Sequence, residues 1–190
     1  MKILKQQARV RGFSMVEVLA VMVILAILGS IGFGTYMLVN RNARVTQAEL
    51  MIENLSTSLE NRVNERFTGD SLDALEASGI LDGDSQYPSG DGSDGSSQNL
   101  YAFLSGDFKA NGSYDAGEIE PAFPEMDPNY QGKGKYLNDD LEIIDPWRTP
   151  IRYKFHIDGE DLNNNVEGGF DIWSAGPDLE FDTEDDIKNW

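Results

Sequence analysis

One carboxylate near the start of the chain stands where an unpaired charge is costly. Glu17 lies at the leading edge of a stretch in which no side chain from Val18 to Val39 carries a charge. As a helix, that stretch is long enough to cross about 30 Å of hydrocarbon. A carboxylate deep in lipid costs about 3 kcal/mol. The sequence therefore predicts that Glu17 has a partner of positive charge.

A basic segment precedes this carboxylate, and a motif joins the two. The first twelve residues carry four basic and no acidic side chains, and residues 12–17 are Gly-Phe-Ser-Met-Val-Glu. The motif and the apolar run resemble the processing site of type IV pilins and type II secretion pseudopilins. In that family a membrane peptidase cuts after the glycine and methylates the new N-terminus. The resemblance implies a leader peptide at residues 1–12, cleavage between Gly12 and Phe13, and N-methylation of Phe13.

The resemblance also implies a role in assembly for Glu17, which falls where the family places its glutamate. Cleavage would free an α-amine at Phe13 that is cationic near neutral pH. Glu17 could pair with this amine of a neighbouring subunit, and such pairing would select subunits in register. It could equally pair within one subunit, since the first and fifth positions of a helix share a face.

A secretory signal peptide and a plain signal anchor are the alternative interpretations of this N-terminus. The apolar run is longer than the 7–15 residues of a signal peptide, and no A-x-A site follows it. A plain anchor does not explain the Gly-Phe-x-x-x-Glu motif. The basic leader favours a cytoplasmic N-terminus. Together with this orientation, the resemblance implies a single-pass protein of the bacterial inner membrane whose head lies in the periplasm.

The composition of the chain limits the classes of ligand that it can bind. The protein has 190 residues, no cysteine and a net charge of −18, which becomes about −22 once the four basic leader residues are removed. Such an acidic surface argues against nucleic acid, whose phosphates require Lys and Arg. It suits a hard cation that binds oxygen ligands instead.

The elements beyond the apolar run predict an α+β fold. Apolar residues recur at helical spacing from Ala48 to Val63, so we expect one helix over residues 13–66. Its first half, residues 13–40, would span the membrane, and residues 41–190 would form the head. Alternating residues predict an antiparallel hairpin of strands at 151–157 and 169–174. Short helices at 71–81 and 100–104 and strand pieces at 136–137 and 141–144 complete a type IV pilin-like long helix on a small sheet.

Three C-terminal segments extend the resemblance to the major pseudopilin of type II secretion. Residues 145–153 read DPWRTPIRY and resemble the D-P-W-G-x-P-Y-x-Y segment of that family. Residues 170–178 read FDIWSAGPD and resemble F-D-L-Y-S-x-G-x-D, and the ending DDIKNW matches D-D-I-x-N-W. Arg148 departs from the pattern, because the family usually has glycine there. Residues 107–129 look like an insertion.

The resemblance assigns a calcium ion to the loop at residues 174–186, which holds six acids. Ca²⁺ takes six to eight oxygens from flexible ligands, and the absence of cysteine and of nearby histidine disfavours zinc. The alternative is a solvated acidic tail. Carried over by position, the ligands are the carboxylates of Asp178, Asp185 and Asp186 and the backbone carbonyls of Ala175 and Glu180.

No residue set in the sequence indicates an enzyme. His156 is the only histidine, and we expect a structural role for it in its strand. The chain has no P-loop and no G-x-S-x-G motif. A second acidic segment at residues 107–118 does not fit the spacing of an EF-hand loop and is more simply a turn-rich loop.

The resemblance implies a structural subunit of a type II secretion pseudopilus. Prepilin peptidase would process it, and copies would polymerise from the inner membrane into a helical filament that promotes protein export across the outer membrane. Its partners would be further copies, other pseudopilins, the inner-membrane secretion platform and the membrane. The alternatives are a type IV pilus or competence-type pilin and a non-polymerising, membrane-tethered calcium-binding module. The missing disulfide and the C-terminal motifs disfavour a pilus subunit.

Overall fold

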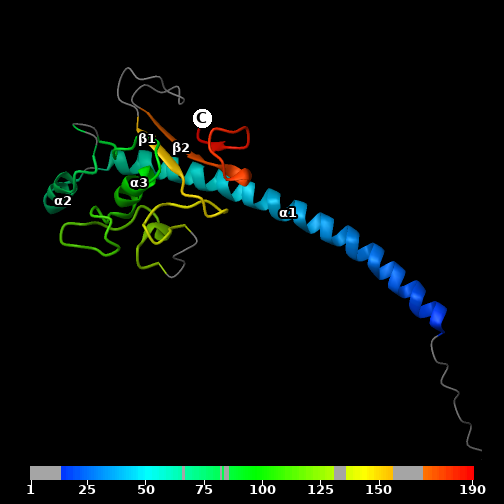
Figure 1. Cartoon of the computed structure of the whole chain (residues 1–190). Helices are drawn as coiled ribbons and strands as arrows, with labels where there is room; N and C mark the ends of the chain where they lie inside the picture. The colour runs from blue at the N-terminus through cyan, green and yellow to red at the C-terminus, as the bar shows by residue number, and fades with distance from the viewer. Residues whose placement is uncertain (1–13, 66, 82, 84–85, 131–135, 156–168) are drawn as a thin grey trace, which may run out of the picture. The chain divides into compact units, whose positions relative to one another are not determined.

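The computed structural model describes residues 14–65, 67–81, 83, 86–130, 136–155 and 169–190 (Figure 1). The chain divides into two compact units, residues 1–41 and residues 42–190. The predicted α+β class is confirmed. The elements, in chain order, are α1 (Met15–Asn64), α2 (Asp70–Ser78), α3 (Ser96–Ser105), the 3₁₀ turn η1 (Pro124–Met126), β1 (Arg152–Phe155), β2 (Phe170–Ser174), the 3₁₀ turn η2 (Gly176–Asp178) and β3 (Ile187–Lys188).

The long helix α1 begins and ends within two residues of the predicted bounds. No proline interrupts it, and its head-side half buries Ala48, Ile52, Leu55 and Leu59. Their spacing of three and four residues places them on one face of the helix. This face supplies one wall of the hydrophobic core.

The sheet is antiparallel with the order β1-β2-β3. Tyr153 of β1 lies opposite Ile172 of β2, so the predicted hairpin strands are confirmed. The third strand, β3, was not predicted, because two residues carry no alternation signal. The strand pieces expected at 136–137 and 141–144 take part in the isolated antiparallel bridges Leu137–Ile143 and Ile144–Pro150 but do not extend into strands.

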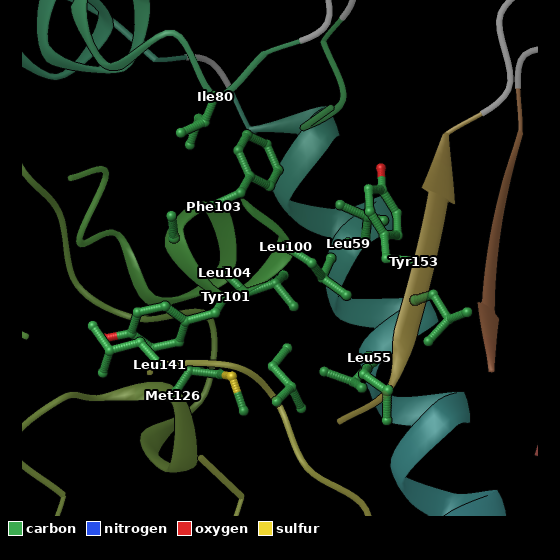
Figure 2. Packing of buried hydrophobic residues seen from close by; sticks show 14 of the residues in the cluster. Leu55, Leu59, Ile80, Leu100, Tyr101, Phe103, Leu104, Met126, Leu141 and Tyr153 are labelled. Atoms are coloured by element: carbon green, nitrogen blue, oxygen red, sulfur yellow. The ribbon is translucent and has the colours of Figure 1, made fainter. Parts of the chain in front are cut away.

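The core lies where α1, α3 and β1 meet (Figure 2). Leu59 of α1, Leu100 and Phe103 of α3 and Tyr153 of β1 are fully buried. Burial of an apolar side chain of this size contributes roughly 1.5–3 kcal/mol. Met126 of η1 is also buried and closes the lower side of the cluster in Figure 2.

Arg62, near the end of α1, is a charged residue that lies buried in the head. Its guanidinium donates to the carbonyl oxygens of Phe103 (3.4 Å), Leu104 (3.1 Å) and Glu120 (2.6 Å). Two of these carbonyls belong to the last turn of α3, where a positive charge is favourable. Arg62 thereby ties α1 to the end of α3.

Candidate functional site

The start of α1 forms a reciprocal hydrogen-bonded cap. The backbone N–H of Ser14 donates to Oε2 of Glu17 (2.7 Å), and the backbone N–H of Glu17 donates to the hydroxyl of Ser14 (3.2 Å). The Ser14 carbonyl accepts the first helical bond, from Val18 (3.2 Å). This is a capping box, which satisfies two backbone donors that a helix start leaves open. The sequence interpretation missed it, although Ser-x-x-Glu before an apolar run is its signal.

The cap shows how the described chain uses Glu17. One carboxylate oxygen bonds to the backbone of the same helix, and in the described residues no hydrogen bond reaches the other oxygen. The predicted partner, the amine of Phe13, and the cleavage residue Gly12 lie outside the described residues. Pairing between Glu17 and that amine stays a prediction.

The turns that follow the cap expose most of their apolar side chains. Met15, Leu19, Met22 and Leu28 each expose more than half of their surface. In the described part of the chain, no helix reaches the length and apolar content that a membrane crossing needs. That residues 13–40 span a membrane stays a prediction.

The two C-terminal motifs with tryptophan meet through Asp145. Its Oδ1 accepts the backbone N–H groups of Trp147 and Thr149 (both 2.9 Å), and its Oδ2 accepts the hydroxyl of Ser174 (2.6 Å). The same hydroxyl accepts the N–H of Gly176 (3.1 Å). Burial raises the pKa of the Asp145 carboxyl. Asp145 thus stabilises the turn at residues 145–149. It also holds Ser174, the last residue of β2, where the chain enters the acidic loop.

Arg148 adopts a left-handed backbone conformation, which glycine takes up most readily. Its φ is 72°, in the left-handed region that costs a non-glycine residue roughly 1–2 kcal/mol. The backbone N–H of Arg148 donates to the Asp145 carbonyl (3.0 Å), and Asp145 in turn bonds Thr149. Arg148 therefore closes a hydrogen-bonded turn and adds local strain to it.

The acidic loop brings together part of the predicted calcium ligand set. The N–H of Asp178 donates to Oδ2 of Asp185 (3.2 Å), and the N–H of Glu180 donates to Oδ1 of Asp178 (2.9 Å). The hydroxyl of Thr183 donates to Oδ1 of Asp185 (2.8 Å) and holds the pKa of that carboxyl below its ordinary value. Asp185 therefore stays ionised in mild acid, as a metal ligand must.

Asp186 differs from the other acids of the loop because its side chain is almost fully buried. Its Oδ2 faces the ammonium of Lys188 (3.3 Å) and accepts the N–H of Asp182 (3.0 Å). Its Oδ1 is buried without a hydrogen-bond partner in the described structure. An orphaned carboxylate oxygen of this kind is costly unless a cation or water meets it.

The arrangement of the loop is partly compatible with calcium. Ala175 is buried and directly precedes η2, which includes Asp178. Among the described residues, no group of three or more acidic, histidine or cysteine side chains converges closely enough to hold a metal. The donors are all oxygens, as calcium requires, and the free Oδ1 of Asp186 is the oxygen that an ion would satisfy.

An aromatic contact also holds the loop on the head. The guanidinium carbon of Arg152, in β1, lies 3.8 Å from the ring centroid of Phe181. The same side chain pairs with Asp94 at 2.9 Å. A stacked cation of this kind contributes about 0.5–1 kcal/mol at an exposed site. The position of the loop is thus determined in part by Arg152.

The second acidic segment, residues 107–118, is a loop organised by a buried carboxylate. Oδ2 of Asp107 accepts the N–H of Gly112 (2.7 Å) and the hydroxyl of Tyr101 (3.2 Å), and Oδ1 accepts the N–H of Asn111 (3.1 Å). Lys109 pairs with Asp115 at 2.6 Å. These contacts give the acids of the loop internal partners, as expected of a turn-rich loop.

Comparison with known proteins supports the N-terminal motif. Residues 7–33 match the family described as the prokaryotic N-terminal methylation motif. The match covers the predicted leader end, the cleavage site, Glu17 and part of the apolar run, and it confirms a type IV pilin-like prepilin signal. No curated protein and no solved structure matches the chain significantly.

Proposed function

We propose that this chain is a structural subunit of a type II secretion pseudopilus. Prepilin peptidase would cut between Gly12 and Phe13 and methylate Phe13, and copies would assemble into a helical filament that promotes protein export. The methylation motif at residues 7–33 carries this proposal. The exposed apolar side chains of α1 support it, because they offer a surface that further copies could bury.

The proposed location is the bacterial inner membrane, with the head in the periplasm. The basic leader supports a cytoplasmic N-terminus, and the uncharged residues 18–39 support a membrane anchor before assembly. Lipid is as apolar as the helix, so transfer from lipid to filament gains little from hydrophobicity. Direction would therefore come from the platform and from specific contacts between subunits.

Glu17 would provide one of those contacts. In the capping box, Oε2 of Glu17 is bonded to Ser14 of the same helix. The second carboxylate oxygen remains for the Phe13 amine of an adjacent copy. Cleavage would create that amine one residue before the cap, so the cap would hold the carboxylate close to the site of processing.

Calcium is proposed as the ion of the acidic loop. The carboxylates of Asp178, Asp185 and Asp186 and the backbone carbonyls of Ala175 and Glu180 would hold it. The orphaned Oδ1 of Asp186 and the lowered pKa of Asp185 support this proposal. The ion would neutralise acids that otherwise repel one another, and it would order the loop between β2 and β3.

Mass spectrometry of the mature N-terminus, in a host with the peptidase, tests the processing step. We expect a chain that begins at N-methylated Phe13, and Gly12→Ala should retain the leader and form no filaments. Gly29→Ala is the matched control, because a Cβ there meets nothing within 4 Å. A wild-type envelope form that begins at Met1, or a Gly12→Ala chain that still forms filaments, would contradict the proposal.

Thermal unfolding of the detergent-solubilised chain tests the ion. Saturating calcium at a hundred times its dissociation constant should stabilise the head by about 2.7 kcal/mol. Asp186→Asn should abolish that gain, whereas Asp139→Asn, at an exposed site outside the loop, should keep it. Equal melting temperatures in calcium and in chelator would remove calcium from the proposal.

A further inference from the structure

The head-side half of α1 carries opposite charges on opposite faces. Glu49, Glu53 and Glu60 are spaced by four and seven residues, so they form one stripe along the helix. Arg44 precedes Glu53 by nine residues, which is two and a half turns, and it therefore lies on the opposite side. It precedes the buried Leu55 by eleven residues, or about three turns, and shares its side.

Among the described residues, these charges have no ion-pair partner in their own copy. Arg44, Glu49 and Glu53 are exposed. Within the described ranges, none of their side chains takes part in a hydrogen bond or an ion pair. Opposite faces of one straight helix cannot meet. Any ion pair between the two sets must therefore join two copies.

The acidic stripe also borders a groove. The groove has a volume of about 300 Å³, and residues 187–189 of the C-terminal segment form its other wall. Ser56 lies in it, and its hydroxyl oxygen is buried with no hydrogen-bond partner in the described residues. Lys188 also borders the groove, but its ammonium is already paired with Asp186. The groove therefore offers the exposed carboxylates of the stripe to a guanidinium, whereas the buried Ser56 hydroxyl lies out of its reach.

We propose that Arg44 of one copy docks on the stripe of Glu49, Glu53 and Glu60 in a second copy. This contact rests on the proposed filament function and specifies its geometry. The two docking surfaces differ, so the contact is heterologous and each copy can bind one neighbour above and one below. Because Arg44 is five residues from Glu49 and nine from Glu53, neighbours would be displaced along α1 by about 8–14 Å at 1.5 Å per residue.

Disulfide cross-linking tests the contact, and the natural chain has no cysteine to interfere. The variant carries Arg44→Cys together with Glu53→Cys. After mild oxidation of intact filaments, it should give a ladder of linked multimers on a non-reducing gel. Each single substitution should give no ladder, because a heterologous contact never brings identical positions together. Arg44→Cys with Asn54→Cys is the matched control, since Asn54 is adjacent in sequence and about 100° away around the helix.

Charge exchange provides a second readout that does not depend on oxidation. Arg44→Glu should lower the sedimentable filament mass about tenfold, because attraction becomes repulsion at each subunit contact. Adding Glu53→Arg to that chain should restore most of the lost mass. N-terminal processing of both variants should match that of the wild type.

The outcomes separate this contact from the filament proposal itself. A wild-type chain that is processed but forms no filaments would overturn the proposed function. Wild-type filaments with no ladder from the 44/53 pair, or with a ladder of equal intensity from the 44/54 pair, would overturn the docking geometry alone. Unchanged filament mass in Arg44→Glu would do the same.

Discussion

The two halves of α1 use the same residue types for different purposes. Leu19 and Leu28 in the first half are largely exposed, whereas Leu55 and Leu59 in the second half are buried in the head. Their charged residues differ in the same way. Glu17 bonds to a residue three positions away, and Arg62 bonds to carbonyls 41, 42 and 58 positions away.

This difference distinguishes residues that stabilise only their own helical turn from residues that stabilise the whole head. A residue whose contacts lie within one helical turn can change without loosening the head. A residue that joins distant segments affects the cooperative unfolding of the whole head, because each segment depends on it. All three tryptophans lie at residue 147 or later, so tryptophan fluorescence of the full chain reports on the head alone.

The largest expected effect is at Arg62. Arg62→Met keeps the length of the side chain but removes a charged donor from the carbonyls of Phe103, Leu104 and Glu120, of which Leu104 keeps the N–H of Ala122. We expect the free energy of unfolding of the head to fall by about 3 kcal/mol. Urea unfolding followed by tryptophan fluorescence measures it. Arg44→Met is the control and should change the free energy of unfolding by less than about 0.5 kcal/mol. Equal effects of the two substitutions would contradict the distinction between local and long-range contacts.

A smaller loss is expected at Asp145. Asp145→Asn cannot accept the Ser174 hydroxyl at its amide nitrogen, which should cost about 1–3 kcal/mol at neutral pH. Asp139→Asn is the exposed control.

The pH dependence sharpens this prediction. Burial raises the pKa of Asp145, so the folded head holds that proton more tightly than the unfolded chain does. The resulting stability is full below the ordinary pKa near 4 and is lost as pH rises through the raised value. Asp145→Asn should remove this loss of stability with rising pH. A variant with the same pH profile as the wild type would contradict the assignment of the pH dependence to Asp145.

A gain is expected at Arg148, where the strain is local. Arg148→Gly relieves the left-handed backbone, although glycine also loses more entropy on folding. We expect a net stabilisation of about 0.5–1 kcal/mol in urea unfolding. Arg148→Ala keeps a Cβ at the same φ and should give no gain, so equal stabilisation by both substitutions would refute the backbone explanation.

The smallest effect on the head is expected at Ser14. Ser14→Ala removes one half of the capping box and should destabilise the start of α1 by about 1 kcal/mol, with no change in head unfolding. Amide hydrogen exchange at residues 15–18 measures the local loss. Ser30→Ala is the control, since its hydroxyl bonds to the Ile27 carbonyl within the helix and caps nothing. A shift in head unfolding would show that the two halves are coupled.

Local patterns made much of the fold predictable. Helical spacing located α1 closely, and alternation located β1 and β2, because these signals depend only on which side of an element faces the core. The helix at 71–81 was also expected and begins at Asp70. The Ser-x-x-Glu cap was equally readable and was overlooked.

Partners far apart in the sequence were not predictable. The burial of Arg62 depends on where α3 ends, 42 residues further along the chain. Arg148 is a departure from the expected motif, and only the structure revealed that its backbone is left-handed.

The order of residues alone determined the N-terminal signal, the long helix and the acidic character of the loop, because each depends on neighbours within a few positions. Only the tertiary structure decided which acids are buried, which oxygens lack partners, and which faces of α1 remain open. Those properties depend on the removal of water by distant segments, and the cost of a buried charge depends on the partners that those segments supply.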